Sequence, residues 1–95
     1  MLRTAILSLT LLASPAFAQS HYRAEPAAKP AVTKIVLRDT IWSCGDSGCS
    51  AGKSGSRPAI VCEVLAREVG ALRSFSVAGQ PIAPEQLEKC NARAN

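Results

Sequence analysis

The chain has 95 residues and a formal net charge of +4, and its basic residues are scattered rather than clustered. A nucleic-acid-binding surface needs a clustered basic patch with aromatic partners, and only 4% of the residues are aromatic, so nucleic acid is excluded as a partner. A chain of this length supports one domain. Four cysteines in so small a chain indicate a fold stabilised by disulfides.

The first 18 residues have the three-part pattern of a secretory signal peptide. Arg3 gives a positively charged start, a mostly apolar run covers residues 5–13, and Ala16-Phe17-Ala18 supplies the small residues of a cleavage site. The apolar run is far shorter than the ~20 residues of a membrane-spanning helix. We therefore predict cleavage between Ala18 and Gln19, and a periplasmic or secreted mature chain without a membrane span.

Residues 19–31 show no hydrophobic periodicity and contain two prolines, which predicts a flexible leader. His21 lies in this leader and is expected to be solvated. The ordered domain is expected to span residues 32–95. Without the signal, ten basic and seven acidic residues remain, and this mild net charge of +3 is typical of a surface that keeps a protein soluble.

The first part of the domain predicts a strand followed by a loop. Residues 32–38 are rich in β-branched side chains and indicate a strand, which residues 41–44 continue after a bulge. Residues 45–55 are rich in glycine and serine, which favour turns. We expect this segment to be a loop with Cys49 in its middle.

A helix is predicted from Pro58 to Gly70, with Ser56 as its N-cap and Gly70 as the left-handed residue that ends it. Its apolar positions recur at helical spacing and place Cys62 on the buried face. They are Pro58, Val61, Cys62, Leu65 and Val69.

The last part predicts a second strand over residues 73–78, in which Phe75 and Val77 share one side. A tight turn at 78–80, a very short third strand at 81–82 and a final helix from Pro84 follow. Cys90 is expected on the inner face of that helix. The order strand, helix, strand, short strand, helix indicates a small disulfide-braced α+β domain.

Four cysteines allow three disulfide pairings. Cys62 and Cys90 both lie on inward helix faces, and the Gly-rich segment between Cys44 and Cys49 is flexible enough to close a short ring. The favoured pairing is therefore Cys44–Cys49 with Cys62–Cys90. The rival pairing, Cys44–Cys62 with Cys49–Cys90, remains open.

Cys44 and Cys49 also admit a thiol–disulfide redox role. Redox proteins use Cys-x-x-Cys at a helix N-terminus, where the dipole lowers the thiol pKa, whereas this spacing is longer and no helix follows. A zinc site needs close ligand pairs, but Cys62 and Cys90 stand alone. The only histidine is His21, so no catalytic triad is available. We expect no catalytic residue, metal or cofactor.

The candidate binding surface is the Gly-rich segment with its flanks, because functional residues often lie on loops held by a rigid scaffold. A purely structural role remains an alternative for two of these residues. Trp42 suits a core position beside a disulfide, and Arg57 suits a helix start that packs over the loop. The surface consists of Trp42, Asp46, Lys53, Ser56 and Arg57.

The cysteine frame resembles a family of short, exported, four-cysteine alphaproteobacterial proteins without an assigned function. The resemblance covers about Ile41 to Arg93, and its most specific parts are the Ser-Arg-Pro-x-x-x-Cys and Cys-Asn elements. It rests on Trp42-Ser43-Cys44, Cys49, Ser56-Arg57-Pro58-Ala59-Ile60-Val61-Cys62, Gly70, Phe75, Gly79, Leu87 and Cys90-Asn91. It implies a Gram-negative envelope protein and brings no activity, cofactor or catalytic residue with it.

Three functional interpretations follow from the sequence. The leading one is a non-enzymatic periplasmic or secreted module that binds a protein, a cell-wall component or another envelope component through the loop side. The second is a thiol–disulfide redox protein that uses Cys44 and Cys49. The third is a structural envelope protein without a defined ligand.

Overall fold

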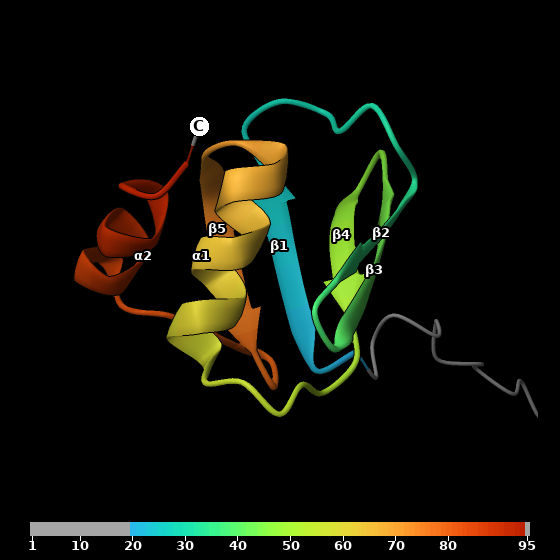
Figure 1. Ribbon diagram of the computed structural model, residues 1–95. Coiled ribbons are helices and arrows are strands. Elements are labelled where there is room, and N and C mark those ends of the chain that lie inside the picture. The colour runs from blue at the N-terminus through green and yellow to red at the C-terminus, as the bar shows by residue number, and fades with distance from the viewer. Residues whose placement is uncertain (1–19, 95) are drawn as a thin grey trace, which may run out of the picture.

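The structure is a computed structural model that describes residues 20–94. Within these residues it has a six-stranded antiparallel sheet in the order β2-β3-β4-β1-β5-β6, with α1 over one face and α2 beside α1 and β5 (Figure 1). This confirms the predicted small α+β domain. The elements are β1 (Tyr22–Pro26), β2 (Lys34–Leu37), β3 (Thr40–Gly45), β4 (Gly48–Ala51), α1 (Pro58–Val69), β5 (Leu72–Val77), β6 (Gln80–Pro81) and α2 (Pro84–Asn91).

Strand β1 lies inside the sheet, between β4 and β5, so the prediction of a flexible leader over residues 19–31 is wrong for this segment. Tyr22 and Ala24 face the core and are almost fully buried, whereas Arg23 and Glu25 are exposed on the other face. The domain therefore begins about ten residues before the predicted start at Val32. The predicted signal peptide lies outside the described residues.

Two hairpins replace the predicted bulge and most of the predicted loop. Residues 38 and 39 form the turn between β2 and β3, where Arg38 takes a positive φ of 55°. The segment expected to be a loop over residues 45–55 contains β4, so that only residues 46 and 47 connect β3 to β4. Cys49 accordingly lies in a strand and is buried.

Helix α1 begins at Pro58 and ends before Gly70, as the sequence predicts. Gly70 has a φ of 90°, a conformation that glycine adopts without steric cost. The predicted N-cap is wrong, because Arg57 occupies the cap position and no side chain caps the helix. The backbone N–H of Ser56 instead donates a hydrogen bond to Ser54 Oγ at 3.0 Å.

The C-terminal elements follow the predicted order. Ala78 and Gly79 both have positive φ, which suits the two-residue turn between β5 and β6. Helix α2 begins at Pro84, and Ala83 occupies its N-cap position without a side-chain hydrogen bond. Its buried residue is Cys90.

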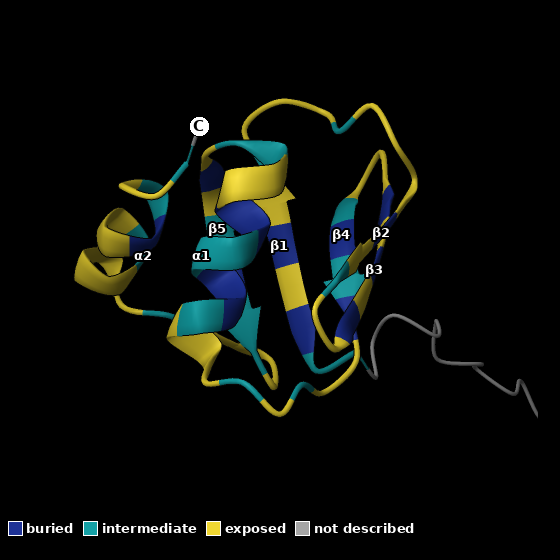
Figure 2. Cartoon of the chain, in the orientation of Figure 1, coloured by how far each residue is buried: buried dark blue, intermediate teal, exposed yellow. Residues whose placement is uncertain are grey.

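The core lies between the helix-covered face of the sheet and the inner side of α1 (Figure 2). Tyr22, Trp42 and Phe75 meet there from three different strands, with ring centroids 5.7–6.2 Å apart. Leu65 of α1 packs in the same cluster and is fully buried. Such aromatic spacing is favourable beyond the area it buries, and it fixes how the strands sit under α1.

Two disulfides brace the domain, and they are the pairs favoured from the sequence. Cys62–Cys90 links α1 to α2 across 28 residues, with a Cα–Cα distance of 5.8 Å. Cys44–Cys49 links directly opposite residues of β3 and β4, with a Cα–Cα distance of 4.0 Å. That separation is close to the ~4.5 Å of a non-hydrogen-bonded antiparallel pair.

Candidate functional site

A groove between the first turns of α1 and the inner side of α2 has a volume of about 490 Å³. This lies within the range of small-ligand sites. The Cys62–Cys90 disulfide forms part of its lining and holds the two helices at a fixed separation. The lining residues are Arg57, Pro58, Ala59, Cys62, Glu63, Ile82, Gln86, Lys89 and Cys90.

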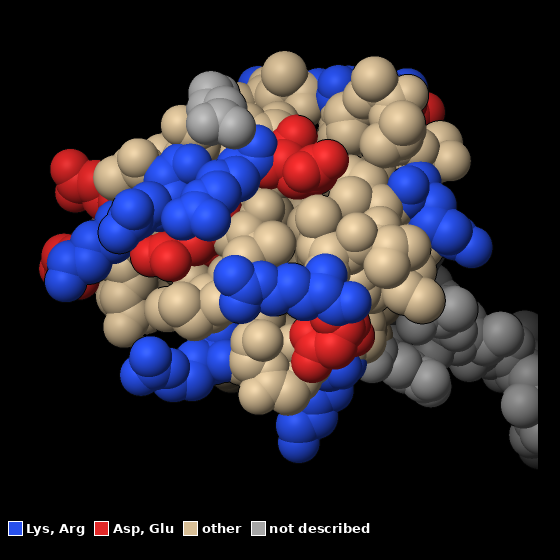
Figure 3. All heavy atoms as spheres, in the orientation of Figure 1, with Lys and Arg blue, Asp and Glu red and all other residues tan. Residues whose placement is uncertain are grey.

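The groove combines an apolar base with a charged rim. Cys62, Cys90 and the half-buried Ile82 supply apolar surface, and the exposed Arg57 and Lys89 place cations at the rim. Glu63 adds one carboxylate to this lining. Figure 3 shows that basic and acidic side chains are interspersed over the helix-bearing face. The groove therefore combines apolar surface with two cations and one carboxylate.

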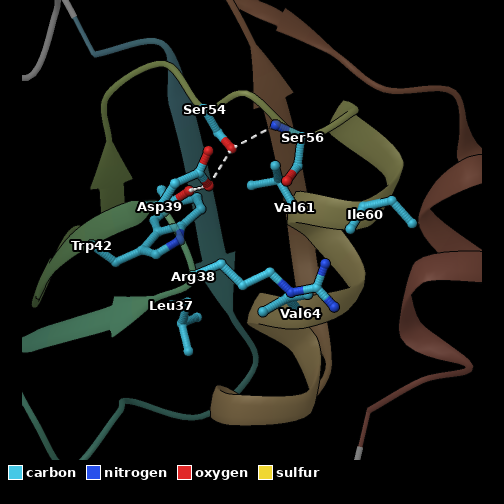
Figure 4. Close-up of a pocket in the computed structure, with 10 residues that line it drawn as sticks. Leu37, Arg38, Asp39, Trp42, Ser54, Ser56, Ile60, Val61 and Val64 are labelled. Carbon is cyan, nitrogen blue, oxygen red and sulfur yellow. Dashed lines mark hydrogen bonds between the residues drawn. The ribbon is translucent and has the colours of Figure 1, made fainter.

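A second depression lies between the β2–β3 turn and α1, and Asp39 organises its polar side (Figure 4). The Asp39 carboxylate accepts hydrogen bonds from Ser54 Oγ and Gly55 N, each at 2.8 Å, and from Thr40 Oγ1 at 3.2 Å. These hydrogen bonds, above all that from Ser54, hold the pKa of Asp39 below its usual value. The depression holds only about 10 Å³, so it is a structural junction and not a ligand site.

The structure does not gather the five predicted surface residues into one site. Trp42 is 1% exposed and belongs to the core, so its place on a binding surface is wrong. Asp46 lies in the β3–β4 turn and pairs with Lys29. Lys53 is exposed in the connection from β4 to α1.

The other two predicted surface residues lie close to α1, but one lines the small depression and the other lines the groove. Ser56 lines the small depression beside the β2–β3 turn. Arg57 is the one member of the predicted surface that lines the groove. The groove therefore retains a single residue of the surface that the sequence suggested.

Sequence reasoning missed the α2 side of the groove. Ile82 and Lys89 lie more than 20 residues from Arg57 and reach it only because α2 docks beside α1. The favoured Cys62–Cys90 pairing was the available signal, because it predicts that the residues around the two cysteines lie close together.

The Cys44–Cys49 pair is poorly placed for thiol chemistry. Cys44 is 9% exposed and Cys49 2% exposed. Thiol–disulfide exchange requires a thiolate to reach one of the sulfur atoms, so its rate depends on access. The burial of these two residues favours a structural bond between β3 and β4.

Neither a metal-binding cluster nor a spanning helix occurs in the described part of the chain. Over residues 20–94, no three His, Cys, Asp or Glu residues are grouped so that they could hold a metal ion. None of the helices in that range is long and apolar enough to cross a membrane.

A family model matches most of the chain. Residues 7–92 match DUF8200, a family of unknown function. No curated protein and no solved structure matches the chain. The matched range contains all four cysteines and every strand and helix described above.

Proposed function

Since the chain belongs to the DUF8200 family, whose function is unknown, we propose that it is an exported, non-enzymatic binding module of the cell envelope. Its partner is a protein or another envelope component. The binding site is the groove between α1 and α2. An apolar group of the partner enters this groove, and an adjacent anionic group contacts Arg57 and Lys89.

The observation that carries this proposal is the groove itself. It has the volume of a ligand site, and a disulfide fixes its width before any partner arrives. A preformed site loses less conformational entropy on binding than a flexible one. The apolar base with two rim cations supplies both an area to desolvate and a charge to orient the partner.

The composition of the groove supports binding without catalysis. Its lining has one carboxylate, Glu63, and contains neither a hydroxyl nor an imidazole group. General acid–base and nucleophilic chemistry use carboxylates, imidazoles, hydroxyls, thiols and amines within hydrogen-bond reach of one another, and of these the lining supplies the Glu63 carboxylate and the Lys89 amine. The groove therefore offers mainly contact surface and charge, which supports a binding role.

Export is supported by the signal-peptide pattern of the first 18 residues and by the two disulfides, which are typical of oxidising compartments. Mass spectrometry of envelope material tests this part. We expect a chain that starts at Gln19. An intact Met1 terminus in the cytoplasmic fraction would contradict export.

The groove is tested by capture from envelope extract with the purified mature chain. We expect Arg57→Ala/Lys89→Ala to lose the partner that the wild type retains. Lys53→Ala/Arg93→Ala is the matched control, because it removes two exposed cations that do not line the groove. Equal loss in both double variants would show general charge attraction and would overturn the proposed site.

A further inference from the structure

The free edge of β2 exposes a defined set of backbone groups. β2 ends the sheet and pairs only with β3 in the described part of the chain. Cys44 N donates a hydrogen bond to Thr33 O at 2.7 Å. Hydrogen-bonded and non-hydrogen-bonded pairs alternate along antiparallel strands, so Lys34 and Val36 are non-hydrogen-bonded with β3. Their N–H and C=O groups therefore point away from the sheet.

The large exposed apolar side chains of the described residues gather at this edge. They are Val32, Val36 and Ile41, which are 54%, 67% and 58% exposed. Val36 and Ile41 are direct cross-strand partners on the face opposite α1, because Ile35 and Trp42 face the core. The edge thus combines unpaired backbone groups with an apolar pair that no described element covers.

The positive charge of Lys34, next to the apolar pair of Val36 and Ile41, favours a partner strand with an acidic residue. Lys34 stands two residues before Val36 on the same face and is exposed. A lysine on an edge strand discourages indiscriminate pairing, and it makes an acidic residue the favourable neighbour in an added strand. Cross-strand pairs of opposite charge are favourable and like-charged pairs are unfavourable.

A second copy of this chain fits the edge poorly. Antiparallel pairing of β2 with itself must join residues whose backbone groups face outward. Placing Val36 opposite Val36 brings Lys34 towards Arg38, the like-charged first residue of the β2–β3 turn, and placing Lys34 opposite Lys34 joins two like charges. Placing Lys34 opposite Val36 avoids both contacts but gives neither lysine a partner of opposite charge. In none of these registers does Lys34 meet an acidic residue, which an added strand of a partner can supply.

From these observations we propose that the β2 edge binds an extended segment of a partner protein as a seventh, antiparallel strand. The segment has an apolar residue opposite Val36 and, two positions further along, an acidic residue opposite Lys34. Main-chain hydrogen bonds to Lys34 and Val36 give affinity, and the alternate side chains give specificity. This edge is separate from the α1–α2 groove, so the inference does not depend on the proposed function.

A pair of synthetic peptides tests the inference. The probe Ac-Thr-Val-Thr-Glu-Thr-Val-Thr-NH2 is titrated into the mature chain, and the control peptide has Lys in place of Glu. We expect slower hydrogen exchange at the Lys34 and Val36 amides with the Glu peptide, and roughly tenfold weaker binding of the Lys peptide. Equal binding of both peptides, or protection confined to other amides, would overturn the proposal.

Two variants separate the edge from a general charge effect. Lys34→Glu should reverse the preference, so that the Lys peptide binds better than the Glu peptide. Val36→Pro removes an N–H that faces away from β3 and should abolish binding of both peptides, because proline is tolerated at such edge positions. Unchanged peptide preference in the folded Lys34→Glu variant, or self-association of the wild type through β2, would contradict the assignment.

Discussion

The Asn91 side chain replaces a missing strand beside Leu72. Asn91 Oδ1 accepts a hydrogen bond from Leu72 N at 2.8 Å, and Asn91 Nδ2 donates one to Leu72 O at 2.8 Å. β6 pairs only with residues 76 and 77 of β5, so it does not reach the start of that strand. The last residue of α2 thereby pairs both backbone groups of Leu72 and ties α2 to the sheet.

Replacing Asn91 with alanine should destabilise the domain by about 2–3 kcal/mol, because two backbone groups in a half-buried position lose their partners. Asn91→Asp should also be destabilising, since a carboxylate cannot donate to Leu72 O. Urea unfolding measures both effects. Glu88→Ala, at an exposed position of the same helix, serves as the control and should stay within about 0.5 kcal/mol of wild type. Equal stability of all three variants would contradict this role.

The elements that the sequence predicts well are those with strong local signals. Pro58 and Gly70 bracket α1, Pro84 opens α2, and Phe75 alternates with polar neighbours in β5. Each signal acts over a few residues through fixed φ, positive φ or side-chain alternation. The favoured disulfide pairing also depended on local faces, because both helix cysteines occur at inward positions.

The elements that the sequence misses are strands imposed by their neighbours. β1 offers only Tyr22 and Ala24 to the core and ends at a proline, so its strand character comes from pairing with β4 and β5. β4 has no β-branched residue, and its conformation comes from the hairpin with β3. The groove needs the docking of two helices that local patterns place only separately.

The central position of β1 predicts which truncations the domain tolerates. A chain that starts at Gln19 keeps β1 and should fold. A chain that starts at Val32 loses the strand between β4 and β5, together with the buried Tyr22, and should show no cooperative unfolding transition. Circular dichroism during thermal unfolding compares the two. A cooperative transition in the shorter chain would refute the essential role of β1.

Gly48 should be intolerant of any side chain. It has a φ of 117°, and a Cβ atom built there would lie 2.7 Å from the backbone oxygen of Ala24 in β1. Gly48→Ala should therefore destabilise the domain by about 2 kcal/mol or more. Gly45→Ala is the matched control on the facing strand, where a Cβ would meet no atom within 4 Å. Urea midpoints that fall equally in both variants would argue against a specific clash.

Asp39 should make stability fall in acid. Its hydrogen bonds lower the folded-state pKa below the value of about 3.9 in the unfolded chain. The unfolded chain thus binds the proton more readily, so the contribution is present above about pH 5 and is lost as pH falls through the folded pKa. Asp39→Asn should lower the urea midpoint at pH 7, and its difference from wild type should shrink as the pH falls below about 4.

The exposed Asp46, whose surface ion pair with Lys29 contributes little, provides a control for this comparison. Asp46→Asn should follow the wild-type curve at every pH. A constant difference between Asp39→Asn and wild type from pH 7 to pH 2 would mean that Asp39 acts through packing and not through its charge.

The last prediction compares the two disulfides. In the chain-entropy model, the 28-residue separation of Cys62–Cys90 corresponds to about 3–4 kcal/mol and the 5-residue separation of Cys44–Cys49 to about 2 kcal/mol. Cys62→Ala/Cys90→Ala also leaves a void in the core and frees α2 from α1. It should therefore unfold at markedly lower urea than Cys44→Ala/Cys49→Ala.

The difference in stability between the two double variants should be smaller than the model alone suggests. Cys44 and Cys49 are buried in paired strands and do not lie in a flexible loop. Removing the Cys44–Cys49 bond should therefore destabilise the domain by more than the loss of a disulfide that closes an exposed loop. Urea unfolding of both double variants, each checked for one remaining disulfide by mass, measures the order. If Cys44→Ala/Cys49→Ala is the less stable of the two, the β3–β4 bond is the main brace of the fold and the chain-entropy ranking fails for this domain.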